Sequence, residues 1–203
     1  MLVPIILGSD KTTVSVATGQ TDYYPLYLSI GNVRNTVRCA HRNAVALIGF
    51  LAMLKSKLYL FDFMHVLIHL LATREHASTP AFRKFKKQLF HSSLSRILDS
   101  LRSAMKDPET VLCGDNYYRR VIYALAAYIA DYEEQVLLSC IVCGWCPKCL
   151  AYRENLDEDA LRRCREHSDM IVNEFNLRNL HESYGLDGDT VVSTSLLFVV
   201  CSD

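Results

Sequence analysis

The sequence predicts an α/β fold in which helices cover a mixed β-sheet. Three features indicate this class: strand-like segments near the start, a long amphipathic helix in the middle, and a buried-type apolar run after it. The chain has 203 residues, half of them hydrophobic, which is enough to bury one core. We therefore expect one domain with an appendage.

Four strands are predicted. Residues 2–7 form a short apolar strand that ends in a Gly-Ser-Asp turn sequence. Residues 12–17 are β-branched and alternating, so we predict that they form the hairpin partner of this strand. A third strand is predicted at residues 26–30, and a fourth, of buried type, at residues 121–129.

Helices are predicted between and after these strands, at about residues 40–53, 81–105 and 157–175. The second is amphipathic, and its apolar stripe is typical of a core-facing helix. That stripe consists of Phe82, Phe85, Leu89, Leu94, Ile97, Leu98 and Leu101. The sequence contains no repeat or low-complexity linker that would mark a domain boundary.

The overall charge does not indicate a nucleic-acid partner, because 22 basic residues balance 22 acidic ones. Local basic clusters remain candidates for such a surface, and the alternative is an ordinary solvated helix face. The clusters consist of Arg83, Lys84, Lys86 and Lys87, with Arg119 and Arg120.

The apolar tracts do not predict a membrane span. Residues 44–53 are too few to cross a bilayer, and the tract at residues 58–72 contains Asp62, His65 and His69. The start of the chain lacks the basic segment of a signal peptide. We therefore expect an intracellular protein whose eight cysteines are reduced or bound to metal.

Four residues have the spacing of a zinc site: Cys146, Cys149, Cys164 and His167. They form C-x2-C, fourteen residues, then C-x2-H, and each short pair offers two donors from one turn. Such a site usually holds together a small segment that could not bury a core of its own.

Other potential ligands are less well placed. Cys140 and Cys143 form a rival C-x2-C, and Cys143 could also pair with Cys146. His65, His69 and Cys113 have no partner at ligand spacing, which favours a structural role.

Two acidic residues follow predicted strands that could be neighbours in the sheet. Asp10 follows the first strand and Asp131 follows the fourth. Paired carboxylates at strand ends can hold one or two Mg²⁺ ions and orient a water or a 3′ hydroxyl for attack on a phosphodiester. The alternative is ordinary turn chemistry, in which aspartate is common.

Five motifs in a fixed order resemble the Plavaka-type transposases, a fungal family related to the CACTA DNA transposons. The resemblance covers roughly residues 2–190. The motifs are Pro4-Ile-Ile-Leu-Gly-Ser-Asp10-Lys-Thr12, Tyr24-Pro-Leu-Tyr-Leu-Ser-Ile-Gly-Asn32, Tyr128-Ile-Ala-Asp131-Tyr-Glu-Glu-Gln135-Val-Leu-Leu138, Gly144-Trp-Cys-Pro-Lys-Cys149 and Leu161-Arg-Arg-Cys-Arg-Glu-His167.

The resemblance implies an RNase H-like catalytic core that cuts and joins DNA with Mg²⁺ or Mn²⁺ held by acidic residues. Asp10 matches the first acid and Asp131 the second, and the Cys/His set matches a cysteine-rich insertion that follows the second acid. DNA is the implied partner, contacted by Lys11 and the basic clusters, and a homo-oligomer is possible. We expect residues 1–138 to form a partial core, residues 139–190 the zinc-binding insertion and helical segment, and residues 191–203 a divergent tail.

The chain also departs from the family pattern. The third acid cannot be assigned, because Glu174, Glu182, Asp187 and Asp189 all lie too early. Residues 55–79 have no recognised counterpart and read as an atypical insertion, such as a retained intron. We therefore expect a transposase fragment that is catalytically inactive alone, because phosphoryl chemistry tolerates little misplacement of metal ions.

Smaller departures indicate sequence drift. Glu133 stands where the family has proline, and Asn116 stands where it has glycine. Two alternatives remain: a domesticated zinc module that binds DNA or protein without catalysis, and the non-functional product of a decayed gene.

Overall fold

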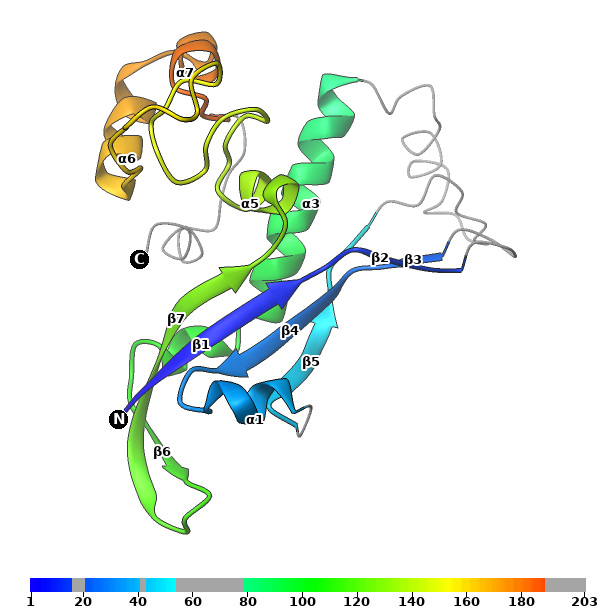
Figure 1. Cartoon of the computed structure of the whole chain (residues 1–203), viewed down its shortest axis with the longest axis vertical. Coiled ribbons are helices and arrows are strands. Elements are labelled where there is room, and N and C mark those ends of the chain that lie inside the picture. Colours follow the sequence, from blue (N-terminus) through cyan, green and yellow to red (C-terminus); the bar gives the residue numbers. More distant parts are fainter. Residues whose placement is uncertain (16–20, 41–42, 54–78, 189–203) are drawn as a thin grey trace.

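The protein is described by a computed structural model covering residues 1–15, 21–40, 43–53 and 79–188. A five-stranded mixed sheet lies at its centre, with the strand order β5-β4-β1-β7-β6 (Figure 1). The strands are β1 (Leu2–Ser9), β4 (Pro25–Ile30), β5 (Val45–Phe50), β6 (Glu109–Leu112) and β7 (Tyr118–Ile129). The mixed α/β class predicted from the sequence is therefore confirmed.

The central strand is β1, and its two neighbours run in opposite directions to each other. It is antiparallel to β4, with Leu7 opposite Leu28, and parallel to β7, with Leu7 opposite Tyr128. The predicted strands at residues 2–7, 26–30 and 121–129 are thus confirmed. Strands β5 and β6 form the two edges, and each is antiparallel to its neighbour.

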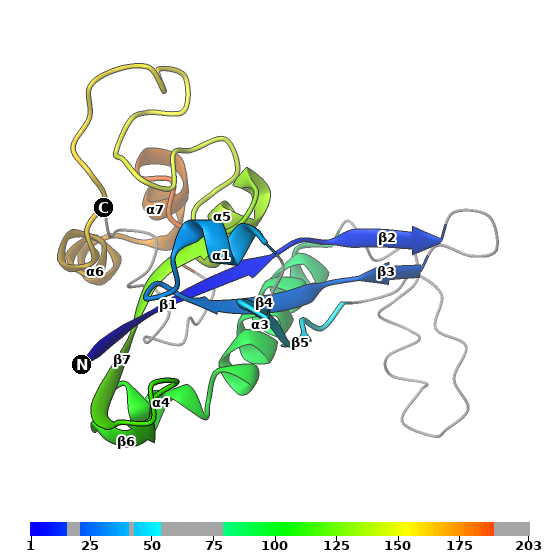
Figure 2. The same ribbon diagram turned by 60° about the horizontal axis from the view of Figure 1, so that its bottom comes forward.

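A second, two-stranded ribbon continues from the sheet. It consists of β2 (Thr12–Ser15) and β3 (Thr21–Tyr23), which pair antiparallel and project beyond the five-stranded sheet (Figure 2). The prediction that this segment forms the hairpin partner of β1 is wrong, because β1 runs on towards β2. Strands β1 and β2 instead follow each other as one extended segment, in which β1 pairs with β4 and β2 pairs with β3.

The helix predicted at about residues 40–53 is also wrong. This stretch contains β5, which pairs with β4, and it is preceded by the short helix α1 (Asn35–Cys39). The run Val-Ala-Leu-Ile-Gly-Phe has no clear alternation, and short apolar runs of this kind fit a strand or a helix equally well. Pairing with β4 decides in favour of the strand.

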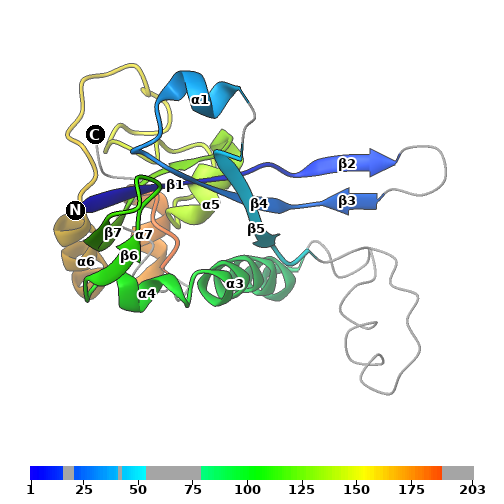
Figure 3. The same cartoon turned by 90° about the horizontal axis from the view of Figure 1, so that it is seen from below.

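Helix α3 (Pro80–Ile97) lies against one side of the sheet, followed by the short α4 (Leu101–Ala104) (Figure 3). Together they confirm the amphipathic helix predicted at residues 81–105, with a break near Leu98. Thr79 caps α3 by accepting a hydrogen bond from the N–H of Phe82, and Pro80 occupies the first turn, where a missing N–H does no harm.

Three further helices follow β7. They are α5 (Tyr132–Leu138), α6 (Arg165–Glu174) and α7 (Leu177–Ser183). Of the helix predicted at residues 157–175, only α6 forms. None of the helices in the described ranges has the length and apolar character needed to cross a membrane. The apolar tract at residues 58–72 lies outside those ranges.

Two hydrophobic clusters form the interior, and we call them the first and second core clusters. The first lies between the sheet and α3, and the second lies among the segments after β7. The first consists of Ile5, Leu7, Leu26, Leu51, Phe90, Leu94, Leu98 and Leu138. The second consists of Val136, Ile141, Trp145, Ile171, Leu180 and Leu186. Helix α5 contributes to both, since Leu138 belongs to the first and Val136 to the second.

Candidate active site

The two predicted catalytic aspartates lie at the same end of the sheet, where β1 and β7 finish. Strands β1 and β7 are parallel neighbours, and the last pair of their ladder is Gly8 opposite Ile129. Asp10 and Asp131 each follow that pair by two residues, so they occupy matching positions beyond the strands. Both residues are exposed. The two parallel strands therefore lead to two exposed aspartates at neighbouring positions.

Asp131 also has an ordinary structural role in the turn that follows β7. It is the N-cap of α5, and its Oδ1 accepts a hydrogen bond of 2.8 Å from the N–H of Glu134. This bond satisfies one of the N–H groups that a helix start leaves without a partner. The cap fixes the direction of the Asp131 side chain without using Oδ2.

Glu134 is a buried acid directly behind these aspartates, with only 5% of its surface exposed. The Ser9 hydroxyl donates a hydrogen bond to its Oε1. Tyr24 makes a second side-chain hydrogen bond to the same carboxyl group. Burial raises the pKa of Glu134, and the nearby charges of Asp131 and Asp10 raise it further, against the lowering effect of these hydrogen bonds.

Tyr128 of β7 completes this network. Its hydroxyl lies 2.5 Å from Ser9 Oγ, and because the Ser9 proton is used towards Glu134, Tyr128 is the donor. Burial raises the pKa of both Tyr24 and Tyr128, and the charge of Glu134 adds to the effect. Both hydroxyls therefore remain protonated donors at neutral pH.

Sequence reasoning missed the role of Ser9, Tyr24, Tyr128 and Glu134. All four lie inside the motifs that carry the family resemblance, so their presence was noted but no function was assigned to them. One local signal was available: Asp131 followed three residues later by Glu134 is a helix-start pattern. That pattern predicts a glutamate that turns back towards the cap, whereas this one reaches across to β1.

The oxygen donors of Asp10 and Asp131 suit Mg²⁺, which prefers carboxylates and keeps several of its waters. Across the described ranges, however, no three His, Cys, Asp or Glu side chains come close enough together to hold a metal ion. The site thus offers two ligands, with Glu134 turned towards the interior.

The acids considered for the third catalytic position lie in other parts of the fold. Glu174 ends α6, and Glu182 lies on α7, where it pairs with Arg178. Asp187 follows α7 and forms an ion pair with Lys87 of α3. Asp189 lies outside the described residues.

The four predicted zinc ligands lie along two segments that pair with each other. Cys149 is bridged to Arg162, and the flanking backbone bonds join Arg163 N–H to Lys148 and Leu150 N–H to Leu161. The same register, continued, puts Cys164 opposite Pro147, but no three of these four side chains come close enough in the described ranges to hold an ion. Cys164 is the N-cap of α6, and His167 lies in its first turn.

Cys146 and Cys149 form one turn in which both thiols are close. The N–H of Cys149 donates to Cys146 Sγ at 3.2 Å, and that of Lys148 does so at 3.4 Å. Partial burial raises the pKa of the Cys146 thiol, but the hydrogen bonds from Cys149 and from these N–H groups outweigh it and lower the pKa. A lowered thiol pKa favours the thiolate, which is the form that binds zinc.

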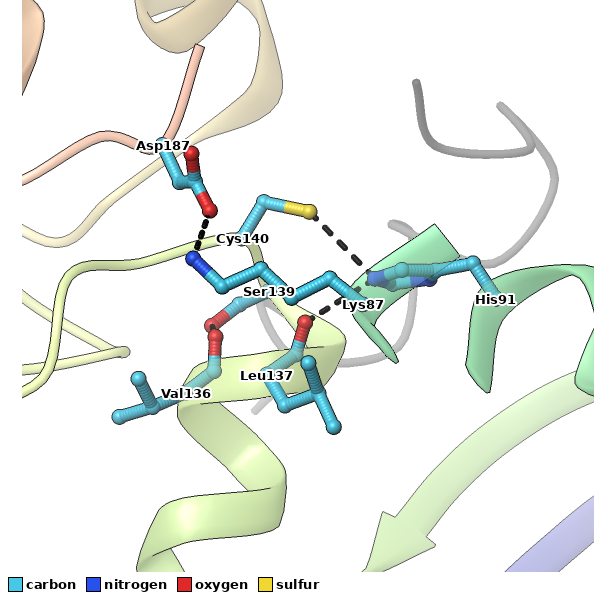
Figure 4. Close-up of polar contacts among 7 residues, drawn as sticks. All are labelled: Lys87, His91, Val136, Leu137, Ser139, Cys140 and Asp187. Atoms are coloured by element: carbon cyan, nitrogen blue, oxygen red, sulfur yellow. Dashed lines mark hydrogen bonds and ion pairs between the residues drawn. The ribbon is translucent and has the colours of Figure 1, made fainter. Parts of the chain in front are cut away.

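The rival thiols occupy different surroundings. Cys140 contacts His91 of α3, with Sγ 3.5 Å from Nε2, and His91 Nε2 also lies 3.1 Å from the carbonyl oxygen of Leu137 (Figure 4). Burial raises the pKa of Cys140 to about 12, so this thiol stays protonated. Cys143 is exposed. Cys113 is partly buried, and His65 and His69 lie outside the described residues.

Several of the predicted DNA-contacting side chains form ion pairs within the protein. Lys11 pairs with Asp22 at 3.3 Å, Lys87 pairs with Asp187, and Arg119 bonds both oxygens of Asp115 at 2.6 Å. Four members of the predicted set are exposed: Arg83, Lys84, Lys86 and Arg120. The role of these residues in binding DNA remains a prediction.

The fold and site define a class: an α/β protein with paired carboxylates at the adjoining ends of parallel strands. Comparison with family models then finds the Plavaka transposase family over residues 1–198. The chain belongs to this family. No curated protein and no solved structure matches it. The match runs across residues 55–79, and the division into core, insertion and tail remains a prediction.

Proposed function

We propose that this transposase-derived protein contains an RNase H-like core whose acidic pair, Asp10 and Asp131, binds Mg²⁺ or Mn²⁺, and that the chain does not cut DNA by itself. The observation that carries the proposal is the parallel pairing of β1 with β7, because both aspartates follow these strands at the same end of the sheet. The strand order supports an RNase H-like core, because β1 lies at the centre between an antiparallel and a parallel neighbour. DNA as partner implies a nuclear location.

The bound metal would supply charge stabilisation to an in-line attack on a phosphodiester. The chain's own contribution is to present two carboxylates from fixed positions, one after β1 and the other held by the α5 cap. Two such ligands are enough to bind a cation that keeps most of its waters, but catalysis also requires the ion to be placed accurately. Since Glu134 faces inward, the described part of the site lacks a third exposed acid.

The proposal is tested first by metal binding. Electron paramagnetic resonance of Mn²⁺ titrated into the full chain should show a bound fraction in the wild type, and Asp10→Asn should remove it. A wild-type chain that binds no Mn²⁺ at roughly millimolar concentration, or an Asp10→Asn variant that binds like the wild type, would contradict the metal site.

The second test is cleavage. Supercoiled plasmid incubated with the chain and Mg²⁺ or Mn²⁺ should remain intact. Nicking that Asp10→Asn abolishes would show that the chain is active and would overturn the inactive part of the proposal. Nicking that persists in the variant would indicate a contaminating nuclease.

We further propose that Cys146, Cys149, Cys164 and His167 bind one structural zinc ion. The antiparallel pairing of the two segments that carry them supports this. Elemental analysis of pure, folded protein should find about one zinc per chain, and Cys146→Ser should reduce it strongly. Folded protein without zinc would contradict the site.

A second candidate function is DNA binding without catalysis. The exposed basic side chains Arg83, Lys84 and Lys86 near the start of α3 favour it, because positive side chains on one helix can neutralise phosphates. Fluorescence anisotropy should then show an affinity for duplex DNA that falls as salt rises. The triple variant with alanine at these positions should lose most of that salt dependence, whereas Lys106→Ala should retain it.

A further inference from the structure

Glu134 is bonded to both sides of the proposed metal site. Its carboxyl group accepts the hydrogen bond of Ser9, which is the residue immediately before Asp10. Its backbone N–H donates to the carboxylate of Asp131. One residue of α5 thus holds the end of β1 through its side chain and the second aspartate through its main chain.

We propose that Glu134 is a positioning residue that sets the spacing between Asp10 and Asp131. The inference rests on the proposed metal site and adds a residue that does not itself bind the cation. The parallel ladder between β1 and β7 ends at Gly8 and Ile129, so it does not reach Asp10 or Asp131. Ser9 is still paired with Leu26 of β4, and its bond to Glu134 connects this end of β1 to α5.

The surroundings of Glu134 indicate a role in geometry rather than in packing alone. Its side chain lies among β1, the segment before β4, and β7, where it meets the hydroxyls of Ser9 and Tyr24, with Tyr128 behind Ser9. An apolar side chain of similar size would fill this space without the free-energy cost of burying a carboxyl group. Hydrogen bonds have direction, however, and a fully bonded buried network fixes the positions of its members.

Groups bonded to metal ligands commonly affect the affinity of a site. Loss of such an outer contact typically lowers metal affinity by about 10- to 100-fold. We expect a change of this size at Glu134, because the substitution releases Ser9 and leaves the hydroxyls of Tyr24 and Ser9 without their shared acceptor.

The test is Mn²⁺ binding to the full-length chain, followed by electron paramagnetic resonance. Glu134→Ala should weaken binding by about tenfold or more and broaden the spectrum of the bound ion. Glu134→Gln should stay within about threefold of the wild type, because its amide oxygen still accepts from Ser9 and Tyr24. Glu133→Ala is the matched control: it removes an exposed carboxylate one residue away on the same helix and should leave binding and spectrum unchanged.

The outcomes separate this inference from the metal site itself. If the wild type binds Mn²⁺, Asp10→Asn abolishes binding and Glu134→Ala behaves like Glu133→Ala, the positioning role is wrong and the metal site stands. If the wild type does not bind, or Asp10→Asn has no effect, the proposed site fails and the inference fails with it. Should Glu134→Ala not fold, Ser9→Ala decides instead: weakening of about tenfold supports the role, and unchanged affinity overturns it.

Discussion

Asp131 combines a structural task with a position suited to metal chemistry. One carboxylate oxygen caps α5, and the residue stands next to Asp10 at the end of the parallel ladder. The two roles make different demands on the side chain. A cap needs only an oxygen acceptor, which asparagine also supplies, whereas a metal ligand benefits from the full negative charge.

Substitution of Asp131 should separate these roles. Asp131→Asn should retain the cap, so the free energy of unfolding should stay within about 0.5 kcal/mol of the wild type while Mn²⁺ binding is lost. Asp131→Ala should lose both, with a destabilisation of about 1 kcal/mol. Urea unfolding and Mn²⁺ titration measure the two effects, and equal destabilisation by both variants would contradict the capping role.

His91 should make the stability of the fold depend on pH. Burial lowers its pKa below 6.5, although the Leu137 carbonyl and Asp187 act in the opposite direction and Lys87 adds to the lowering. The neutral ring is therefore favoured in the folded state. Its contribution to stability is complete above pH 6.5 and is lost as pH falls from 6.5 towards the folded-state pKa.

Urea unfolding between pH 7.5 and 5.5 should reveal this dependence. Over the range where the unfolded chain is protonated and the folded one is not, stability should fall by up to about 1.4 kcal/mol per pH unit. His91→Gln should reduce the slope, since glutamine can still donate to the Leu137 carbonyl but does not titrate. His181→Gln, which changes an exposed histidine of α7, should leave the slope unchanged.

At the scale of elements, the segment between β7 and α6 and the turn after α7 depend on two glycines with positive φ, Gly144 and Gly185. Gly185 has a φ of +63°, and a side chain there would overlap the indole of Trp145, which is buried in the second core cluster. The backbone also bonds across this point, because Val142 N–H donates to the carbonyl of Gly185 at 2.8 Å. The close approach of backbone to indole requires glycine.

Two glycine substitutions should distinguish crowding from backbone strain. Gly144 also has positive φ, at +93°, but open space surrounds its missing side chain. Gly144→Ala should cost about 1 kcal/mol of stability from strain alone. Gly185→Ala should cost roughly 1–3 kcal/mol more, because Trp145 must also move. Thermal unfolding measures both, and equal losses would show that Trp145 adapts freely.

The elements that sequence patterns predicted correctly have a clear hydrophobic pattern. Strand β1 and the amphipathic α3 each bury one side, and β7 contains a long apolar run although most of it is only partly buried. The prediction was wrong for β5, which lies at an edge with Val45 and Leu47 about half exposed and is decided by pairing with β4. It was also wrong for the partner of β1, because pairing order depends on contacts far along the chain.

For the candidate site, sequence predicted the acids but not their support. Asp10 and Asp131 were recognisable because they follow strands and match family motifs. Glu134 was not, because its partners Ser9 and Tyr24 are 125 and 110 positions away in the sequence and only the assembled sheet brings them together. The Cys/His spacing predicted a zinc set, and the pairing between residues 148–150 and 161–163 could not be deduced from spacing alone.

At the scale of the whole molecule, the two core clusters are joined by α5 and by contacts to α3. Leu138 and Val136 divide α5 between the clusters, and the ion pair of Lys87 with Asp187 connects α3 to the segment after α7 (Figure 4). Asp187 N–H also donates to the carbonyl of Cys140 at 2.9 Å. The cysteine-rich segment is thus attached to the side of the core that α3 covers.

A double-mutant cycle should detect coupling across this junction. Because the Asp187 side chain is only 14% exposed, the cycle of Lys87→Ala with Asp187→Ala should give a coupling energy of about 1 kcal/mol in urea unfolding. The exposed pair Arg178 and Glu182 on α7 is the matched control and should give about 0.3–0.5 kcal/mol. A coupling at Lys87 no larger than in the control would show that the junction does not depend on this pair.

The parallel ladder between β1 and β7 also has a consequence during protein synthesis. Leu2 pairs with Ile122, so the central strand must wait for about 120 further residues before its second neighbour exists. At about 5–20 residues per second, this delay is on the order of ten seconds on the ribosome. Once β4 has been made, β1 and β4 can pair, while the other side of β1 still offers unpaired backbone groups to any strand nearby. The nascent chain is therefore most exposed to aggregation before β7 emerges, and slower folding of later segments would prolong that period.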